Sequence, residues 1–231
     1  MGKETVSMPP DNPAAIQTVK LLKRRWLSQK AFEIELTRPA SFEFKAGQTI
    51  RFIHETIKRY YSLLSSPDDP NLTLCVHYVP KGLFSQVLAG AEIGTHFYVT
   101  GPHGYFTFRP CTRQPVFVAT GTGIAPFISM GRSGVTDFML LHEVEFAEDL
   151  YYHNLFRKIS LNYVPCLLKP LVGDIQPPGT FHGNAADFIR EKLQPASYDF
   201  YLCGGREMTR EVTLLADVRF PGSYVFKEVF F

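Results

Sequence analysis

The sequence has few cysteines, and none of them is arranged as a metal or cluster site. Its four cysteines, Cys75, Cys111, Cys166 and Cys203, are widely scattered and form no CxxC pair. An iron–sulphur cluster or a structural zinc site is therefore not expected, and we predict free thiols. The seven histidines show no metal-ligand spacing with an acidic partner, so we predict no metal site.

Long apolar runs and a strong net charge are also absent. No apolar run approaches about 18 residues and no signal-peptide core is visible, so we expect a cytoplasmic protein without membrane insertion. The net charge of +2 gives no overall attraction to nucleic acid. The basic run at 20–26 is either a solvated strand face or a docking patch for an acidic partner. No GxSxG turn or Ser–His–Asp order indicates a hydrolase.

What is present is a chain of 231 residues whose pattern changes near residue 110. Residues 1–110 contain six short alternating runs and one short helical piece at 84–90, which predicts an antiparallel β-barrel. In residues 111–231, strands alternate with helices, which predicts an α/β domain with a doubly wound parallel sheet. The strands are expected at 116–119, 137–143, 163–168, 198–204 and 224–230, and the helices at 147–159, 184–193 and 206–218.

Two glycine-bearing turns follow strands of the predicted parallel sheet, where such sheets bind ligands. "TGTGIAP" opens a helix, and Gly121 and Gly123 would let a pyrophosphate approach the backbone. "YLCGG" ends a later strand and places Cys203 at the rim of the sheet. A bare tight turn and a small buried cysteine remain the alternatives for these two motifs.

The motifs "RYYS", "KGLFS", "GPHGYF", "GTGIAP", "LCGGREM" and "EVFF" occur in one order along the chain. That order resembles the ferredoxin–NADP reductase family of flavoproteins over roughly residues 14–231. The resemblance implies an FAD-binding barrel followed by a nicotinamide-nucleotide-binding domain. It implies that Arg59 pairs with the FAD pyrophosphate, that Tyr61 lies against the isoalloxazine ring and that Ser62 hydrogen-bonds near flavin N5. Strand alternation puts Ser62 on the opposite face from the other two, so its role requires a local twist.

The resemblance assigns further residues to the two cofactors. On the flavin side, "HYVPKGLFS" supplies His77, Tyr78, Val79, Gly82, Leu83, Phe84 and Ser85, with the Ser85 hydroxyl assisting backbone N–H groups at the helix start. An ordinary capped helix is the alternative for that segment. On the nicotinamide side, the residues are Gly121, Thr122, Gly123, Pro126, Cys203, Gly204 and Met208. Cys203 is expected to position the nicotinamide and not to act as a nucleophile.

The end of the chain places Glu228 and Phe230 where the family often has an acidic residue and an aromatic stacked on the flavin. Phe231 follows, and packing of this aromatic pair at the domain interface is the alternative. Ser62, Cys203 and Glu228 are therefore assigned to the reacting centre. The segment at 128–136 leaves room for only about two helical turns.

The implied function is that of an FAD-dependent reductase, which moves electrons between NAD(P)H and a separate carrier protein such as a ferredoxin or flavodoxin. Glu145 follows the second strand of the α/β domain, where the adenosine ribose is expected. A carboxylate there accepts hydrogen bonds from the ribose hydroxyls and repels a 2′-phosphate, so NADH is the expected nucleotide. The alternative for this acidic stretch is a helix cap. We expect a monomer. An electron-transfer subunit of a larger oxidoreductase and a flavin-binding sensor are the alternative functions.

Overall fold

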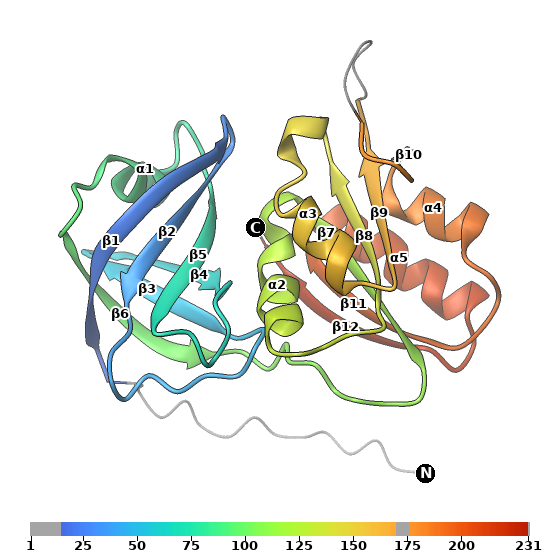
Figure 1. Ribbon diagram of the computed structural model, residues 1–231, viewed down its shortest axis with the longest axis horizontal. Coiled ribbons are helices and arrows are strands. Elements are labelled where there is room, and N and C mark those ends of the chain that lie inside the picture. Colours follow the sequence, from blue (N-terminus) through green and yellow to red (C-terminus); the bar gives the residue numbers. More distant parts are fainter. Residues whose placement is uncertain (1–14, 170–175, 231) are drawn as a thin grey trace.

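The computed structural model describes residues 15–169 and 176–230 and places two six-stranded sheets side by side (Figure 1). The first sheet contains β1 (Gln17–Ser28), β2 (Ala31–Thr37), β3 (Thr49–His54), β4 (Ile57–Ser62), β5 (Asn71–His77) and β6 (His96–His103). Its order is β4-β3-β6-β1-β2-β5, and neighbouring strands are antiparallel. An isolated bridge from Leu63 to Leu74 joins the two edges, so the sheet forms a barrel that is not closed by continuous pairing.

The barrel follows from the alternation of its strands. Along β2, the buried side chains are Phe32, Ile34 and Leu36, and between them Glu33 and Glu35 face outward. The two glutamates form ion pairs with Arg25 and Lys23 of β1, at 3.2 and 3.0 Å. Helix α1 (Leu83–Gly90) packs against the same apolar core. The basic run at 20–26 is thus a strand face with acidic partners of its own, as the first interpretation expected.

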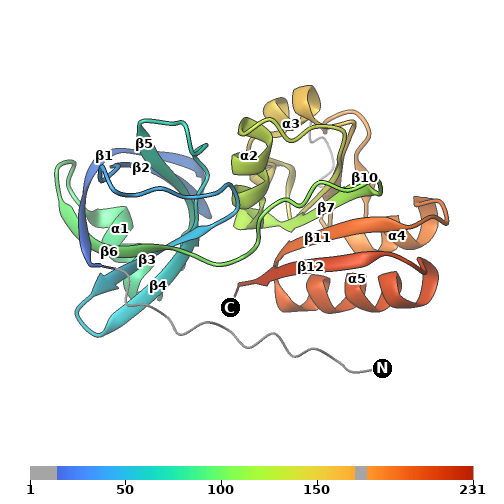
Figure 2. The same ribbon diagram turned by 90° about the horizontal axis from the view of Figure 1, so that it is seen from below.

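The second sheet is parallel throughout, which confirms the predicted doubly wound architecture. Its strands are β7 (Gln114–Thr120), β8 (Met139–Val144), β9 (Asn162–Leu167), β10 (Phe181–His182), β11 (Tyr198–Gly204) and β12 (Tyr224–Val229). Their order is β10-β9-β8-β7-β11-β12. Helices α2 (Ala125–Arg132) and α3 (His153–Ile159) cover one face, and α4 (Ala185–Lys192) and α5 (Arg206–Arg219) cover the other (Figure 2). The strand order reverses between β7 and its neighbour β11.

One predicted helix has the wrong extent. The segment 147–159 forms a short 3₁₀ helix, η2 (Ala147–Asp149), and then α3. Tyr152, with a left-handed φ of 59°, separates the two and breaks the continuous helix that the apolar spacing predicted. The two-residue β10 was not predicted, and the other expected strands and helices are present with changes at their ends. Helix α2 has the expected length of about two turns.

The two sheets share part of their apolar core. One cluster contains Ala31, Leu64 and Cys75 from the first half of the chain, together with Phe117 and Ile124 from the second half. A separate cluster fills the barrel, and a third lies between the second sheet and helices α4 and α5. The shared cluster fixes the barrel against the face of the second sheet that α2 and α3 cover.

Phe117 lies at the centre of the shared cluster and provides a test of it. Its ring is fully buried and stacks between Phe127 and Phe138, with centroid distances of 4.6 and 4.5 Å. Phe117→Ala should lower the free energy of unfolding by about 3–5 kcal/mol, because it removes apolar contacts and leaves a cavity. Urea denaturation followed by circular dichroism measures the change. The control Val218→Ala, at a site 80% exposed on α5, should change it by less than about 0.5 kcal/mol; equal losses would contradict this packing.

Candidate functional site

The turns after β7 and β11 interlock where the strand order reverses. A Cβ atom at Gly123 would lie 2.2 Å from the Cys203 carbonyl oxygen, and one at Gly204 would lie 2.0 Å from the Thr120 hydroxyl. That hydroxyl accepts a hydrogen bond of 2.8 Å from the Gly205 backbone N–H. These two glycines are therefore required by the contact between the turns, a reason that the sequence motifs did not reveal. The contact also places both predicted nucleotide-binding motifs at one point of the sheet edge.

A buried histidine that the sequence did not single out supports the first turn. His142, on β8, is fully buried, with Nε2 3.1 Å from the Gly121 carbonyl oxygen and Nδ1 3.4 Å from the Tyr163 hydroxyl. Because a carbonyl only accepts, the proton lies on Nε2 and Nδ1 accepts from the tyrosine. Burial lowers the pKa of His142 to about 4, so the ring is neutral near pH 7. Gly121 itself has a positive φ of 50°, which suits glycine in this turn.

Glu228 and Cys203 occupy paired positions on the adjacent strands β12 and β11. The Oε2 atom of Glu228 is buried and has no hydrogen-bond partner within the described parts of the chain. Burial raises the pKa of this carboxyl to about 7. Cys203 is completely buried, and burial together with the nearby Glu228 raises the pKa of its thiol well above the usual range. Since the thiolate is the nucleophilic form, this environment agrees with a positioning role for Cys203.

The remaining predicted residues of the second domain are those for the nicotinamide side and Phe230, which was predicted to stack on the flavin. Thr122 is half-buried in the 3₁₀ turn that follows β7, and the backbone N–H of Phe230 donates to the Gly204 carbonyl at 2.9 Å. Phe230 also packs on the apolar cluster that contains Cys203. Pro126 is buried in the first turn of α2, and Met208 is buried between α5 and the sheet. The side chains of both are covered by core neighbours, and their roles beside the nicotinamide stay predictions. Phe231 lies outside the described residues.

The predicted flavin side begins on β4. Arg59 is exposed, and its Nη1 donates to the Lys58 carbonyl at 2.8 Å. Tyr61 is half-buried, and its ring packs against Phe52 and Phe84. Ser62 is 3% exposed at the end of the strand. Its hydroxyl is buried and finds no hydrogen-bond partner among the residues that the structure describes.

The segment 77–85 turns from β5 into α1. Gly82 precedes the helix, and a Cβ there would lie 2.8 Å from the Cβ of Val79, so glycine is needed for this turn. Val79 and Leu83 are exposed apolar side chains beside it. The predicted role of the Ser85 hydroxyl is not supported, because that hydroxyl accepts from the Val79 N–H at 3.1 Å and also contacts the Val79 carbonyl oxygen at 3.3 Å. Ser85 instead ties the turn to the helix.

The remaining residues of this segment have different surroundings. His77 is exposed at the end of β5. The Tyr78 ring lies edge-on to Trp26, at a centroid distance of 5.3 Å. Phe84 is buried in the barrel core against Phe52. Only the backbone of Phe84 is therefore available to a ligand at the start of α1. The prediction for this segment likewise used backbone N–H groups.

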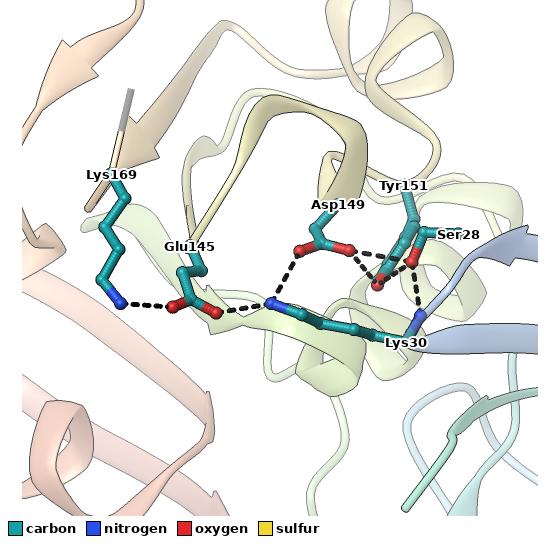
Figure 3. Close-up of polar contacts among 6 residues, drawn as sticks. All are labelled: Ser28, Lys30, Glu145, Asp149, Tyr151 and Lys169. Carbon is teal, nitrogen blue, oxygen red and sulfur yellow. Dashed lines mark hydrogen bonds and ion pairs between the residues drawn. The ribbon is translucent and has the colours of Figure 1, made fainter. Parts of the chain in front are cut away.

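Glu145 is not the free carboxylate that the sequence suggested. It follows β8, and its two oxygens lie 2.5 Å from Lys30 Nζ and 2.6 Å from Lys169 Nζ (Figure 3). Hydrogen bonds from Lys169 and Lys30 lower the pKa of Glu145 to about 2. Lys30 comes from the turn between β1 and β2, so this ion pair joins the two domains. The position of Glu145 at the carboxyl edge of the sheet agrees with the expected place of the ribose, but its charge is already balanced.

Among the described residues, no group of three or more histidine, cysteine, aspartate or glutamate side chains is placed to hold a metal ion. Of the helices in 15–169 and 176–230, none is long and apolar enough to cross a membrane.

Known proteins similar to this chain include ferredoxin reductases. Residues 19–108 match the family model of the oxidoreductase FAD-binding domain. The chain is 34% identical to ferredoxin–NADP reductase B of Sorangium cellulosum over 148 residues, covering 58% of this chain and 61% of that protein. It is 28% identical over 215 residues to the ferredoxin–NAD(P)(+) reductase component of the naphthalene 1,2-dioxygenase system of Pseudomonas putida, covering 87% and 64%. The chain thus spans less than two thirds of the length of these two relatives.

The fold is also found in a solved structure of similar length. A ferredoxin NADP+ reductase from Neisseria gonorrhoeae, solved with bound FAD and NADP, superimposes with a TM-score of 0.79 at 25% identity. The match covers 94% of this chain and 99% of that one. The motif order that suggested the family therefore coincides with a shared arrangement of both domains.

The buried carboxyl of Glu228 predicts a pH-dependent stability. Its folded pKa of about 7 lies above the ordinary value of 4.5, so between these pH values the folded chain keeps a proton that the unfolded chain releases. This group therefore destabilises the fold increasingly as pH rises through that window. Glu228→Gln should be as stable as the wild type near pH 4 and more stable by on the order of 1–3 kcal/mol at pH 8. Unfolding free energies measured across this range test it, and a difference independent of pH would contradict it.

Proposed function

This chain belongs to the ferredoxin–NADP reductase family, and on that basis we propose that it is an FAD-dependent oxidoreductase. It transfers electrons between a nicotinamide nucleotide and a separate one-electron carrier protein. The observation that carries the proposal is that the buried hydroxyl of Ser62 and the buried Oε2 of Glu228 find no hydrogen-bond partner among the described residues. They belong to different domains; Ser62 is two positions before Leu64 of the shared core, and Glu228 pairs across the sheet with Cys203 of the same core.

The residues on the barrel side fit a flavin dinucleotide. An unpaired buried hydroxyl costs about 1–3 kcal/mol, so Ser62 is explained by a polar group that completes it. Arg59 offers an exposed guanidinium fork of the kind that binds phosphate, on the same strand as the flat ring of Tyr61. The start of α1 carries no acidic residue in its first turn and is bordered by the exposed Val79 and Leu83. The barrel side therefore offers groups for both the phosphates and the apolar ring of a flavin dinucleotide.

The residues of the second domain would position the nucleotide. Bound FAD would supply the conversion of a hydride into single electrons. Gly121 and Thr122 present the turn before α2 to a pyrophosphate, and the neutral His142 holds the Gly121 carbonyl away from it. Cys203 shapes the wall next to Gly204, and Phe230 covers this wall and excludes water. Glu228 can keep a proton at its buried carboxyl near neutral pH.

We further propose a preference for NADH over NADPH. Glu145 lies at the carboxyl end of β8, where the adenosine ribose is expected in a doubly wound sheet. Its carboxylate remains ionised and each oxygen keeps a free lone pair for a ribose hydroxyl. Lys30 and Lys169 pair with the same carboxylate and balance its charge.

The relatives support a protein partner for the electrons. The names of two of them specify a ferredoxin as partner, one as a ferredoxin–NADP reductase and one as the reductase component of a dioxygenase system. A small carrier of this type is the proposed partner. The second name also favours the alternative in which this chain serves as the reductase component for a separate oxygenase.

The proposal predicts a yellow protein whose flavin is reduced by nicotinamide nucleotides. Purified protein reconstituted with FAD should lose its visible flavin absorbance when NADH is added without oxygen. Half-saturation should be lower for NADH than for NADPH in stopped-flow measurements. A protein that FAD cannot reconstitute would refute the proposed function, whereas a lower half-saturation for NADPH would refute only the nucleotide preference.

Arg59 tests the placement of the flavin. Arg59→Ala should raise the dissociation constant for FAD by about 10- to 100-fold, because a charge-assisted hydrogen bond to phosphate contributes about 1.5–3 kcal/mol. Fluorescence titration of apoprotein with FAD measures it. The matched control is Lys58→Ala, which removes the same charge from the neighbouring exposed position on the other face of β4. Equal effects of the two substitutions would show that only the net charge matters.

A further inference from the structure

Glu145 occupies a site that two lysines form at the carboxyl edge of the second sheet. The pairing of β8 with β9 extends to this point, because the Lys169 backbone N–H donates to the Glu145 carbonyl at 2.9 Å. The two ammonium groups lie on opposite sides of the carboxylate, one oxygen each (Figure 3). Each of the three side chains keeps more than a third of its surface exposed, so a ligand can reach all of them.

Lys30 is held in this place by the domain junction. Its backbone N–H donates to the Ser28 hydroxyl at 3.0 Å, and that hydroxyl donates to the buried Asp149 carboxylate at 2.8 Å. The Tyr151 hydroxyl donates to the same carboxylate oxygen at 3.0 Å. The ammonium of Lys30 lies 3.6 Å from the other oxygen of Asp149 and 4.8 Å from the centre of the Phe146 ring. The first domain therefore delivers a fixed cation to the nucleotide-binding edge of the second.

The charges of this cluster balance only while Glu145 is present. Lys30 and Lys169 contribute two positive charges, and Glu145 and Asp149 contribute two negative ones. Without the Glu145 carboxylate, two ammonium groups would remain opposite the single charge of Asp149, which already accepts from two hydroxyls. Two cations at the ribose end of a nucleotide site are the chemistry that a 2′-phosphate requires.

We propose that Lys30 and Lys169 are specificity-determining residues for the nicotinamide nucleotide, and that Glu145 is the internal counter-ion of their two-lysine site. With Glu145 in place, the lysines position a carboxylate for the ribose hydroxyls of NADH. When the carboxylate is removed, the same lysines bind the 2′-phosphate of NADPH. This inference rests on the proposed function. It attributes the preference for NADH over NADPH to a three-residue cluster that spans both domains, and not to Glu145 alone.

The experiment measures binding of two nucleotide fragments, AMP and 2′,5′-ADP, to the FAD-loaded protein by isothermal titration calorimetry. Glu145→Gln should tighten 2′,5′-ADP by about ten-fold or more and leave AMP within about three-fold. Adding Lys169→Met or Lys30→Met to Glu145→Gln should reverse most of that gain. Lys192→Met, an exposed lysine at the end of α4, is the matched control and should not reverse it.

A second readout uses the wild-type Glu145 background. Lys30→Met should raise the half-saturation for NADH in flavin reduction with little change in the limiting rate, and Lys30→Arg should restore it. Unchanged 2′,5′-ADP affinity in Glu145→Gln would overturn the inference, and so would a gain that survives both lysine substitutions. Because the fragments bind without turnover, this failure is distinct from failure of the proposed function, which would appear as wild-type flavin that neither NADH nor NADPH reduces.

Discussion

The contact between the ends of β7 and β11 is the constraint on which the rest of the structure depends. Gly123 and Gly204 let the two turns interlock, and the Thr120 hydroxyl joins them. Because these strands flank the reversal of strand order, the contact fixes where α2 begins and where β12 carries Glu228. A side chain at either glycine would displace backbone or a bonded hydroxyl, and would move both halves of the nucleotide side together.

Three buried polar groups of the two domains are satisfied to different degrees. His142 has a partner at each ring nitrogen and remains neutral, so it costs the fold little. Ser62 and Glu228 each leave an oxygen without a partner in the described chain, and such atoms are unfavourable. Keeping these two oxygens buried lowers the stability of the fold, and such a cost is characteristic of binding sites.

Alternation and helix-strand succession predicted the barrel, the parallel sheet and the position of both glycine turns, because these features depend on local pattern. The features that local pattern did not predict depend on distant neighbours. One partner of Glu145 is Lys30, 115 positions away in sequence, and no local pattern indicates their ion pair. Met208, on α5, was assigned from a motif and packs in the core, and its role at the nicotinamide stays a prediction. His142 had no signal at all, because a lone histidine in an apolar strand has the same appearance whether or not it supports a turn.

An apolar cluster that continues from one domain into the other makes their folding cooperative. Opening the barrel alone would expose Ile124 to water and would leave the buried carboxylate of Asp149 without Ser28 and without the cation of Lys30. Partial unfolding of one domain is therefore disfavoured relative to unfolding of the whole, and the chain has the character of a single thermodynamic unit. Damage to the barrel far from either cofactor would reduce the folded population of both domains, so that flavin and nucleotide binding would be lost in parallel.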